Sequence, residues 1–277
     1  MPTRRRRWAV HLLVVVGALV MLYPLFWLIS SSFKPNDEIF TDPGLVPETV
    51  VADNYATGWG ALGVPFSGFF ANSFIIAAAA VAGNVMSCSM AAYAFARLSF
   101  RFRKLWFAIM LMSIMLPIHV LIVPQYTLFK YLGWVDTFLP LIVPKFLAVD
   151  GFFIFLMVQF IRSLPRELDD AARIDGCGPI LVYWRIILPL SRPALITTAI
   201  FTFIWTWDDF FSQLVYLSDV STYTVPLALR AFLDSSGGSS WGPMLAMAVL
   251  SLIPILGFFL IFQRRITEGI STTGLKG

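Results

Sequence analysis

The residues best suited to bind a solute form an aromatic and acidic run near the end of a long apolar stretch. Asp208 and Asp209 follow Trp205 and Trp207 and precede Phe211. Aromatic rings pack on the C–H faces of sugars, and carboxylates accept hydrogen bonds from hydroxyl groups. Trp205 and Asp208 are three residues apart and so share a helix face, whereas Trp207 sits about 200° round from Trp205. The pattern predicts a substrate pathway built from Trp205, Trp207 and Asp208, in which at most one tryptophan faces the lumen. The alternative is an interfacial aromatic belt beside solvated acids.

The chain shows no pattern for an energy source or a catalytic centre. A phosphate-binding loop needs GxxxxGK followed by Ser or Thr. The nearest approach is Gly269 to Gly274, and Leu275 then occupies the lysine position. HExxH, GxSxG and two-His metal spacings are absent. His11 and His119 lie far apart in or beside apolar stretches, which favours structural roles over a proton relay. We therefore expect no catalytic residue, no metal site and no cofactor in this chain.

The polar segment from Ser163 to Leu195 is patterned as two short helices. Pro165 suits a first helical turn, acidic residues follow it, and Gly176 stands where a left-handed cap is favoured. A second helix is expected to start at Pro179 and stop at Pro189. A helix of about ten residues is marginal alone in water, so its apolar stripe should be covered by the membrane face or by a docked partner. The stripe consists of Leu164, Leu168, Ala171 and Ala172.

The elements that position these residues are membrane helices. Hydrophobic residues make up 58% of the 277 residues and charged ones 13%, whereas soluble domains carry about 25% charged residues. Two cysteines, Cys88 and Cys177, exclude a disulfide framework and a Cys-rich metal site. Six apolar stretches are long enough for helical spans and lack the alternation of barrel strands. They run from Ala9 to Phe33, Phe69 to Ala96, Leu105 to Phe129, Leu139 to Ile161, Ala194 to Leu217 and Gly242 to Phe262.

The distribution of basic residues predicts the orientation. With the N-terminus inside, 16 of the 20 lysines and arginines fall on inner segments, and the loop from Lys34 to Gly68 is acidic. This is the positive-inside pattern, so both termini are expected in the cytoplasm. The first apolar stretch exceeds the core of a signal peptide and lacks a small-residue cleavage site, which predicts a retained helix.

The polar segment also carries a specific motif. Asp170-Ala171-Ala172 is followed by three residues, Gly176, nine residues and then Ile186-Ile187-Leu188-Pro189. It resembles the inner loop E-A-A, three residues, Gly, nine residues, I-x-L-P of permease subunits in binding-protein-dependent ATP-binding-cassette importers. The longer context is similar to the maltose-type second permease subunit. Its matching stretches are SSFKP at Ser31, IFLMVQFIRSLPREL at Ile154, AARIDG at Ala171, LPLSRPAL at Leu188, WTWDDF at Trp205 and GLKG at Gly274. Two positions depart from the family: Asp170 replaces its glutamate, and Cys177 replaces a small Ala or Ser.

The resemblance implies an all-α membrane protein with six transmembrane helices and the type I importer permease fold, in the plasma membrane of a bacterium or archaeon. It implies three segments: 1-68 with the first helix and outer loop, 69-263 as the permease core with a cytoplasmic coupling loop at 163-193, and 264-277 as a cytoplasmic tail. The implied coupling residues are Glu167, Asp170, Ala171, Ala172, Asp175, Gly176, Ile186, Leu188 and Pro189.

The resemblance further implies a transport subunit rather than an enzyme. Its expected partners are a second permease subunit, two cytoplasmic ATPase subunits that bind ATP and Mg, and an extracytoplasmic solute-binding protein. The expected solute is a carbohydrate; glycerol phosphate or an amino sugar is the alternative. A membrane enzyme is disfavoured because no nucleophile, base or metal cluster is found. A self-contained channel or secondary transporter should instead show an intramembrane charge chain or inverted repeats.

Overall fold

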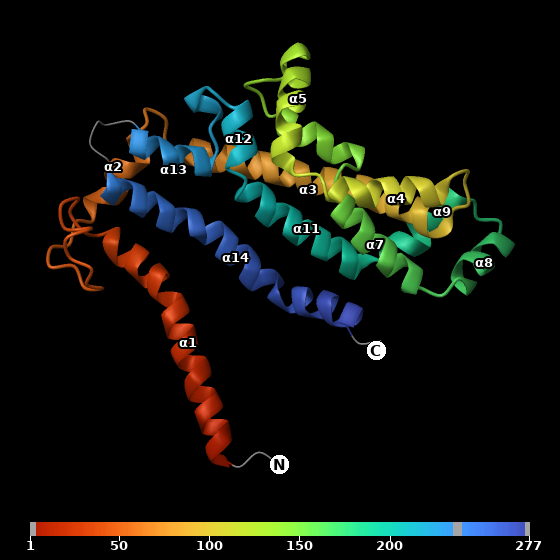
Figure 1. The fold of residues 1–277 in the computed structure, drawn as a ribbon, viewed down its shortest axis with the longest axis horizontal. Helices are drawn as coiled ribbons and strands as arrows, with labels where there is room; N and C mark the ends of the chain where they lie inside the picture. Colours follow the sequence, from red (N-terminus) through yellow and green to blue (C-terminus); the bar gives the residue numbers. More distant parts are fainter. Residues whose placement is uncertain (1–3, 235–239, 275–277) are drawn as a thin grey trace. The chain divides into compact units, whose positions relative to one another are not determined.

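The computed structural model describes residues 4–234 and 240–274, and its regular elements there are helical (Figure 1). The chain forms two compact units. The first comprises Met1–Gly68 and Ala228–Ile253, and the second Phe69–Leu227 and Pro254–Gly277. The elements in chain order are α1 (Arg4–Ser31), α2 (Asp53–Gly60), α3 (Phe66–Arg97), α4 (Arg103–Ile114), α5 (Ile118–Tyr131), α6 (Leu139–Ile142), η1 (Val143–Leu147), α7 (Gly151–Ser163), α8 (Glu167–Ile174), α9 (Pro179–Val182), η2 (Tyr183–Ile187), α10 (Leu188–Leu190), α11 (Arg192–Trp207), α12 (Phe211–Tyr216), η3 (Val220–Thr222), α13 (Val225–Asp234) and α14 (Trp241–Gly274).

The first unit is organised by a buried lysine in the segment after α1. Lys34 is fully buried, and its Nζ donates to the backbone oxygens of Asp42 at 2.6 Å and Gly44 at 2.7 Å, and to Asp42 Oδ2 at 3.0 Å. Asn54 of α2 donates to the backbone oxygens of Ser32 and Lys34. A buried charge needs such partners to offset its lost hydration. The loop after α1 therefore folds around the lysine of the SSFKP stretch.

The core of the second unit forms where α7 packs against α3 and α11. Phe153, Met157 and Ile161 of α7 are at most 1% exposed and lie in one cluster with Cys88 and Ala92 of α3. The small residues of α3 allow close approach: a Cβ added at Gly83 would lie 2.7 Å from Phe146 of η1. Small side chains at helix contacts are the usual means of close packing in a membrane.

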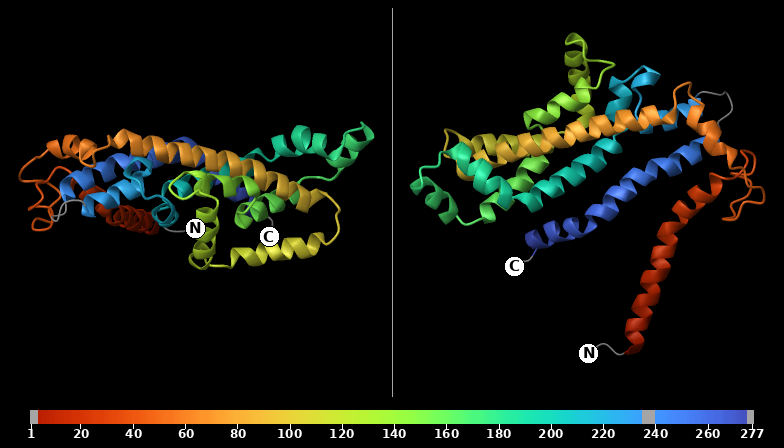
Figure 2. Two further views of the ribbon diagram at one scale, coloured as in Figure 1. Left: turned by 90° about the horizontal axis from the view of Figure 1, so that it is seen from above. Right: turned by 180° about the vertical axis from the view of Figure 1, so that it is seen from behind.

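Among residues 4–234 and 240–274, four helical stretches are long and apolar enough to cross a membrane, and up to six spans result if each of two bent pairs counts as one. The third predicted stretch is such a pair, because α4 and α5 meet at 102° (Figure 2). The physical reason is Pro117, which lacks an N–H and disfavours helical backbone at Leu116. The expectation of one continuous helix from Leu105 to Phe129 is therefore wrong.

The fifth predicted stretch also differs from a single helix. α11 ends at Trp207, and a new helix, α12, begins at Phe211. Asp209 lies in the gap, and its Oδ1 accepts the backbone N–H of Ser212 at 3.0 Å. A side chain that caps the following N–H groups favours a fresh helix start. The continuous helix from Ala194 to Leu217 is replaced by two helices with a polar break.

A second polar anchor holds the segment that follows α12. Asp136 has φ 63°, and its Oδ1 accepts the backbone N–H groups of Ser218 and Asp219 at 2.9 Å each. Asn72 of α3 donates to the backbone oxygens of Ser221 and Tyr223. The segment is thus fixed by two side chains that are distant in sequence.

Candidate functional site

The polar inner segment forms a short helix with a defined stop. α8 ends at Ile174, and Gly176 follows with φ 80°. The Gly176 N–H donates to Arg173 O at 3.0 Å, and the Cys177 N–H donates to Ala172 O at 2.9 Å. This pair of bonds is the Schellman motif, which needs a left-handed residue at the glycine position. An added Cβ at Gly176 meets no atom within 4 Å, so the glycine is required by backbone conformation rather than by close packing.

One side of α8 is anchored to α3 and α7 of the same unit. Ala172 is 5% exposed and belongs to the apolar cluster that also contains Cys88 of α3 and Phe153 of α7. Leu164 and Cys177 pack against this cluster. Asp169 Oδ2 lies 3.1 Å from Arg97 Nε, with the two side chains 9% and 4% exposed. Arg97 Nη2 also donates to Leu164 O at 2.8 Å. The last residue of α3 therefore holds both α8 and the turn before it.

The other side of α8 is free of these contacts. Leu168 and Ala171 are exposed, so only part of the predicted apolar stripe is covered by this chain. The large apolar side chains of Ile174 and Ile180 are 87% and 77% exposed. Arg173 and Asp170 approach each other to 3.7 Å in an exposed pair, which contributes at most about 1 kcal/mol. Figure 1 shows α8 extending past the end of α7.

The predicted coupling residues divide between these two environments. Glu167, Asp170, Ala171, Asp175, Gly176 and Pro189 are exposed, Ile186 and Leu188 are half-buried, and Ala172 is buried. The second helix starts at Pro179, as the sequence predicted, but its middle, Tyr183–Ile187, is π-helical. Ile187, which the motif leaves variable, is fully buried. The residues of the motif therefore form an exposed surface on a buried support.

The predicted pathway residues do not all lie together. Trp205 and Asp208 line one cavity of about 360 Å³, whose lining residues come from α3, α5, α6, η1, α7, α11, α12 and the segment between α11 and α12. Trp205 is 51% exposed and contacts the rings of Phe152 and Phe153. Trp207 is 2% exposed, lies outside the lining of that cavity and packs with Phe70, Phe74 and Phe203.

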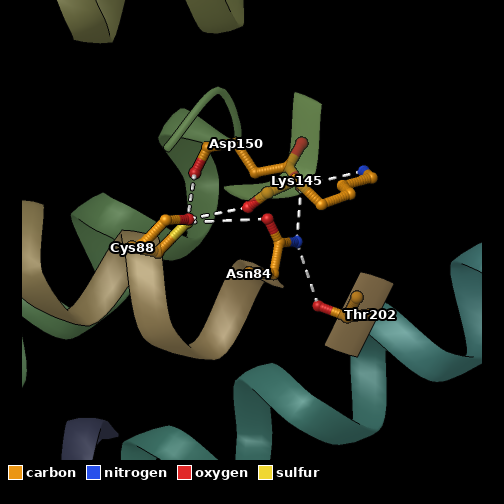
Figure 3. A network of polar contacts seen from close by, with 6 residues as sticks. Asn84, Cys88, Lys145, Asp150 and Thr202 are labelled. Carbon is orange, nitrogen blue, oxygen red and sulfur yellow. Dashed lines mark hydrogen bonds and ion pairs between the residues drawn. The ribbon is translucent and has the colours of Figure 1, made fainter. Parts of the chain in front are cut away.

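One wall of this cavity is a polar network that crosses three elements (Figure 3). Lys145 Nζ of η1 lies 2.9 Å from Asp150 Oδ2, which also accepts from Asn84 Nδ2. Asn84 is fully buried in α3, and its amide reaches Thr202 Oγ1 of α11 at 3.2 Å. Cys88 Sγ lies 3.7 Å from Asn84 Oδ1. An amide suits this position because it donates and accepts at once.

Two residues of these sites carried little signal in the sequence. Asp169 stood among several acids of a polar helix, and only the fold places it, rather than Asp170, against Arg97. Asn84 follows a run of small residues, a pattern typical of close helix packing. Its intramembrane position was the available signal, because an unpaired polar group in lipid is costly.

The near-match to a phosphate-binding loop is part of a helix. Residues 269–274 continue α14, whereas a phosphate cradle requires a glycine-rich loop before a helix. Within the described residues, no cluster of three or more His, Cys, Asp or Glu side chains is arranged to hold a metal ion. The second unit contains the cavity lined by Trp205 and the partly exposed helix α8.

Comparisons with known proteins agree with this arrangement. The family model described as "Binding-protein-dependent transport system inner membrane component" matches residues 83–271. The chain is 33% identical over 271 residues to the trehalose/maltose transport system permease protein MalG of Thermococcus litoralis, covering 96% of this chain and 97% of that protein. It is 31% identical over 266 residues to the sn-glycerol-3-phosphate transport system permease protein UgpE of Yersinia enterocolitica, covering 94% of each.

A solved structure matches the fold over most of the chain. It is a crystal structure of a bacterial ABC transporter involved in the import of the acidic polysaccharide alginate. The TM-score is 0.81, and the match covers 95% of this chain and 98% of that chain at 22% sequence identity. The family model spans the α8 loop and the cavity residues from Asn84 onward, whereas Ile76 of the lining lies before its first residue.

Proposed function

The chain belongs to the family of inner membrane components of binding-protein-dependent transport systems, and on this premise we propose that it forms half of the pathway of an ATP-driven carbohydrate importer. It is a multi-pass membrane permease subunit rather than an enzyme. The name of the trehalose/maltose relative supports a sugar as the solute. The name of the glycerol-phosphate relative keeps a phosphate ester as the alternative, together with an amino sugar.

The observation that carries the coupling role is the two-sided character of α8. Its inner side is tied to α3 through Ala172 and Asp169, while Leu168 and Ile174 are exposed. Exposed apolar side chains beside charges fit a protein partner better than open solvent. We assign the exposed surface of α8 as the binding site of a cytoplasmic ATPase subunit. The buried side of α8 would transmit the movement of that subunit to the membrane helices.

The energy source and the other subunits lie outside this chain. Two ATPase subunits would bind ATP and Mg, a second permease subunit would complete the pathway, and an extracytoplasmic binding protein would deliver the solute. In this arrangement the α8 loop and both termini are cytoplasmic, in line with the distribution of basic residues. The cavity lined by Trp205 and Asp208 then belongs to the translocation pathway.

The experiment that tests coupling compares two glycines of the same loop. Gly176 has φ 80°, whereas Gly178 has φ −73°, and neither has an atom within 4 Å of an added Cβ. Valine is strained only at the first position, because left-handed backbone is unfavourable to β-branched residues. In the assembled importer, Gly176→Val should lower uptake per ATP hydrolysed, and Gly178→Val should leave that ratio unchanged. Normal coupled uptake in Gly176→Val would overturn the assignment.

A panel of solutes tests the proposed substrate. The importer is assembled from this chain, a second permease, the ATPase and the binding protein, and uptake of neutral sugars, an amino sugar and sn-glycerol 3-phosphate is compared. Uptake of a neutral sugar supports the carbohydrate proposal. Uptake of sn-glycerol 3-phosphate alone would contradict the carbohydrate proposal and support a phosphate ester as the solute.

A further inference from the structure

The cavity lined by Trp205 has an uneven distribution of charge. Lys145, Asp208 and Asp209 all contribute to its lining. A second cavity of about 330 Å³ shares Lys145 and Asp209 with the first. The lining of the first cavity therefore contains one ammonium group and two carboxylates, and the second cavity adds the carboxylate of Asp150, in spaces of the size of a small-molecule site.

The single ammonium group is already neutralised. Lys145 Nζ lies 2.9 Å from Asp150 Oδ2, and the Asn84 amide holds the same carboxylate (Figure 3). The backbone of Lys145 is fixed as well, because Ser87 Oγ donates to its carbonyl oxygen at 2.7 Å. Lys145 therefore contributes to the lining as one member of an ion pair rather than as an uncompensated cation.

The two carboxylates have no comparable compensation. Within the described residues, neither Asp208 nor Asp209 lies within 4.0 Å of a basic nitrogen. The one described hydrogen bond of Asp209 is from the Ser212 backbone N–H. A cleft lined by one sign of charge concentrates solutes of the opposite sign and repels those of the same sign.

We infer that this cavity rejects anionic solutes and accepts uncharged or cationic polyhydroxyl solutes, with Asp208 and Asp209 as the residues that determine this selection. The inference rests on the proposed translocation pathway, and it restricts the solutes of that pathway to those without a negative charge. A sugar would place a C–H face on Trp205 and donate hydroxyl hydrogens to the carboxylates. A phosphate ester would meet two negative charges and find its only nearby cation occupied.

The test measures the charge of the cavity without knowledge of the natural solute. Ser212 lines both cavities, and its side chain is half-buried, so Ser212→Cys places a thiol in the space. Cys177 is replaced by serine, and Cys88 is retained because it is fully buried. Rates of reaction with a trimethylammonium-ethyl and a sulfonato-ethyl methanethiosulfonate are measured on the assembled importer. The labelling is done at about pH 8, well above the ordinary range for carboxyl groups.

The expected ratio of the cationic to the anionic rate exceeds that of a free small thiol by about tenfold. Asp208→Asn combined with Asp209→Asn should bring the ratio to the free-thiol value. Asp37→Asn, at an exposed position of the loop after α1, serves as the control and should leave it unchanged.

The outcomes separate this inference from the proposed pathway. Reaction of both reagents with the free-thiol ratio would overturn the charge selection and leave the pathway standing. Absence of reaction with either reagent in every nucleotide state would overturn both, because water would not reach the cavity. Uptake of sn-glycerol 3-phosphate by the unmodified importer at the rate of a neutral sugar would also overturn the selection.

Discussion

Arg97 and Asp169 form a buried ion pair between the last turn of α3 and the first turn of α8, with 3.1 Å between Nε and Oδ2. The same arginine donates to Leu164 O, so it fixes the backbone on which α8 starts. Because α3 also carries Asn84 in the cavity wall, one helix connects the exposed inner loop with the solute cavity. We propose that this helix transmits movement between the two sites.

The first prediction concerns this pair. Asp169→Asn leaves Arg97 buried without its counter-charge and should destabilise the protein by about 3–5 kcal/mol. The combination with Arg97→Gln should recover part of that loss, because no uncompensated charge remains. Thermal unfolding of the purified protein measures the effect. Asp170→Asn, at an exposed position with a 3.7 Å pair, is the control. Equal stability of the two single variants would show that the buried pair has no such role.

The second prediction separates the two tryptophans. Trp205→Ala should reduce sugar uptake while expression and thermal stability stay near normal, since Trp205 is 51% exposed in the cavity lining. Trp207→Ala removes a ring packed among Phe70, Phe74 and Phe203 and should cost about 3–5 kcal/mol of stability. Uptake and unfolding are measured on both variants. The opposite pattern would reverse the assignment of the two faces of α11.

The third prediction concerns the lysine of the first unit. Lys34→Met keeps the aliphatic chain but leaves the partly buried oxygens of Asp42 and Gly44 without their donor, which should destabilise the loop after α1. The unfolding temperature should fall, and protease cleavage in the loop after α1 should increase. Lys130→Met at an exposed position controls for loss of charge alone. Unchanged unfolding and cleavage would mean that the hydrogen bonds around Lys34 contribute nothing.

The fourth prediction is a pH dependence of the segment after α12. Backbone N–H groups of Asp219 and Ser218 lower the pKa of Asp136. A lowered folded-state pKa gives stability that is complete above the unfolded-state value, about 3.9, and is lost as pH falls through the lower folded-state pKa. Hydrogen exchange at the Ser218 and Asp219 amides, corrected for its intrinsic pH dependence, should accelerate below about pH 4.

The matched variant for that measurement is Asp136→Asn. Asparagine tolerates φ 63° and retains a carbonyl acceptor, but it has no charge to titrate. Its exchange should be faster at neutral pH and should no longer change below about pH 4. The same acid-induced acceleration in both proteins would exclude Asp136 as the titrating group.

The sequence was a good guide where local chemistry decides the structure. Gly176 and Pro179 were expected to end one helix and start the next, and both do so. The membrane class followed from composition because the physical requirement of some 20 apolar residues for each span leaves few alternatives. The family resemblance added the fold, and the family match and the structural neighbour confirm it.

Features that depend on distant partners were not readable from the sequence. Asp208 and Asp209 stand in an apolar run, so periodicity alone continued the fifth helix through them, although α11 ends at Trp207. Lys145 and Asp150 are close in sequence, and their spacing is compatible either with an ion pair or with two solvated charges. In the structure the two side chains form an ion pair, and Asn84 of α3 donates a hydrogen bond to the same carboxylate. Sequence patterns describe one helix at a time, whereas these contacts join residues of three elements, α3, η1 and α11.

The break at Pro117 has a consequence for membrane insertion. α4 has 12 residues and α5 has 14, which correspond to about 18 and 21 Å of helix, against a hydrocarbon core of about 30 Å. Neither half alone is long enough to be released into lipid as an independent span. α4 contacts α7, and α5 contacts α12, so both halves depend on helices that are synthesised after them. The third span is therefore expected to reach its final position late, once the C-terminal half of the second unit has left the ribosome.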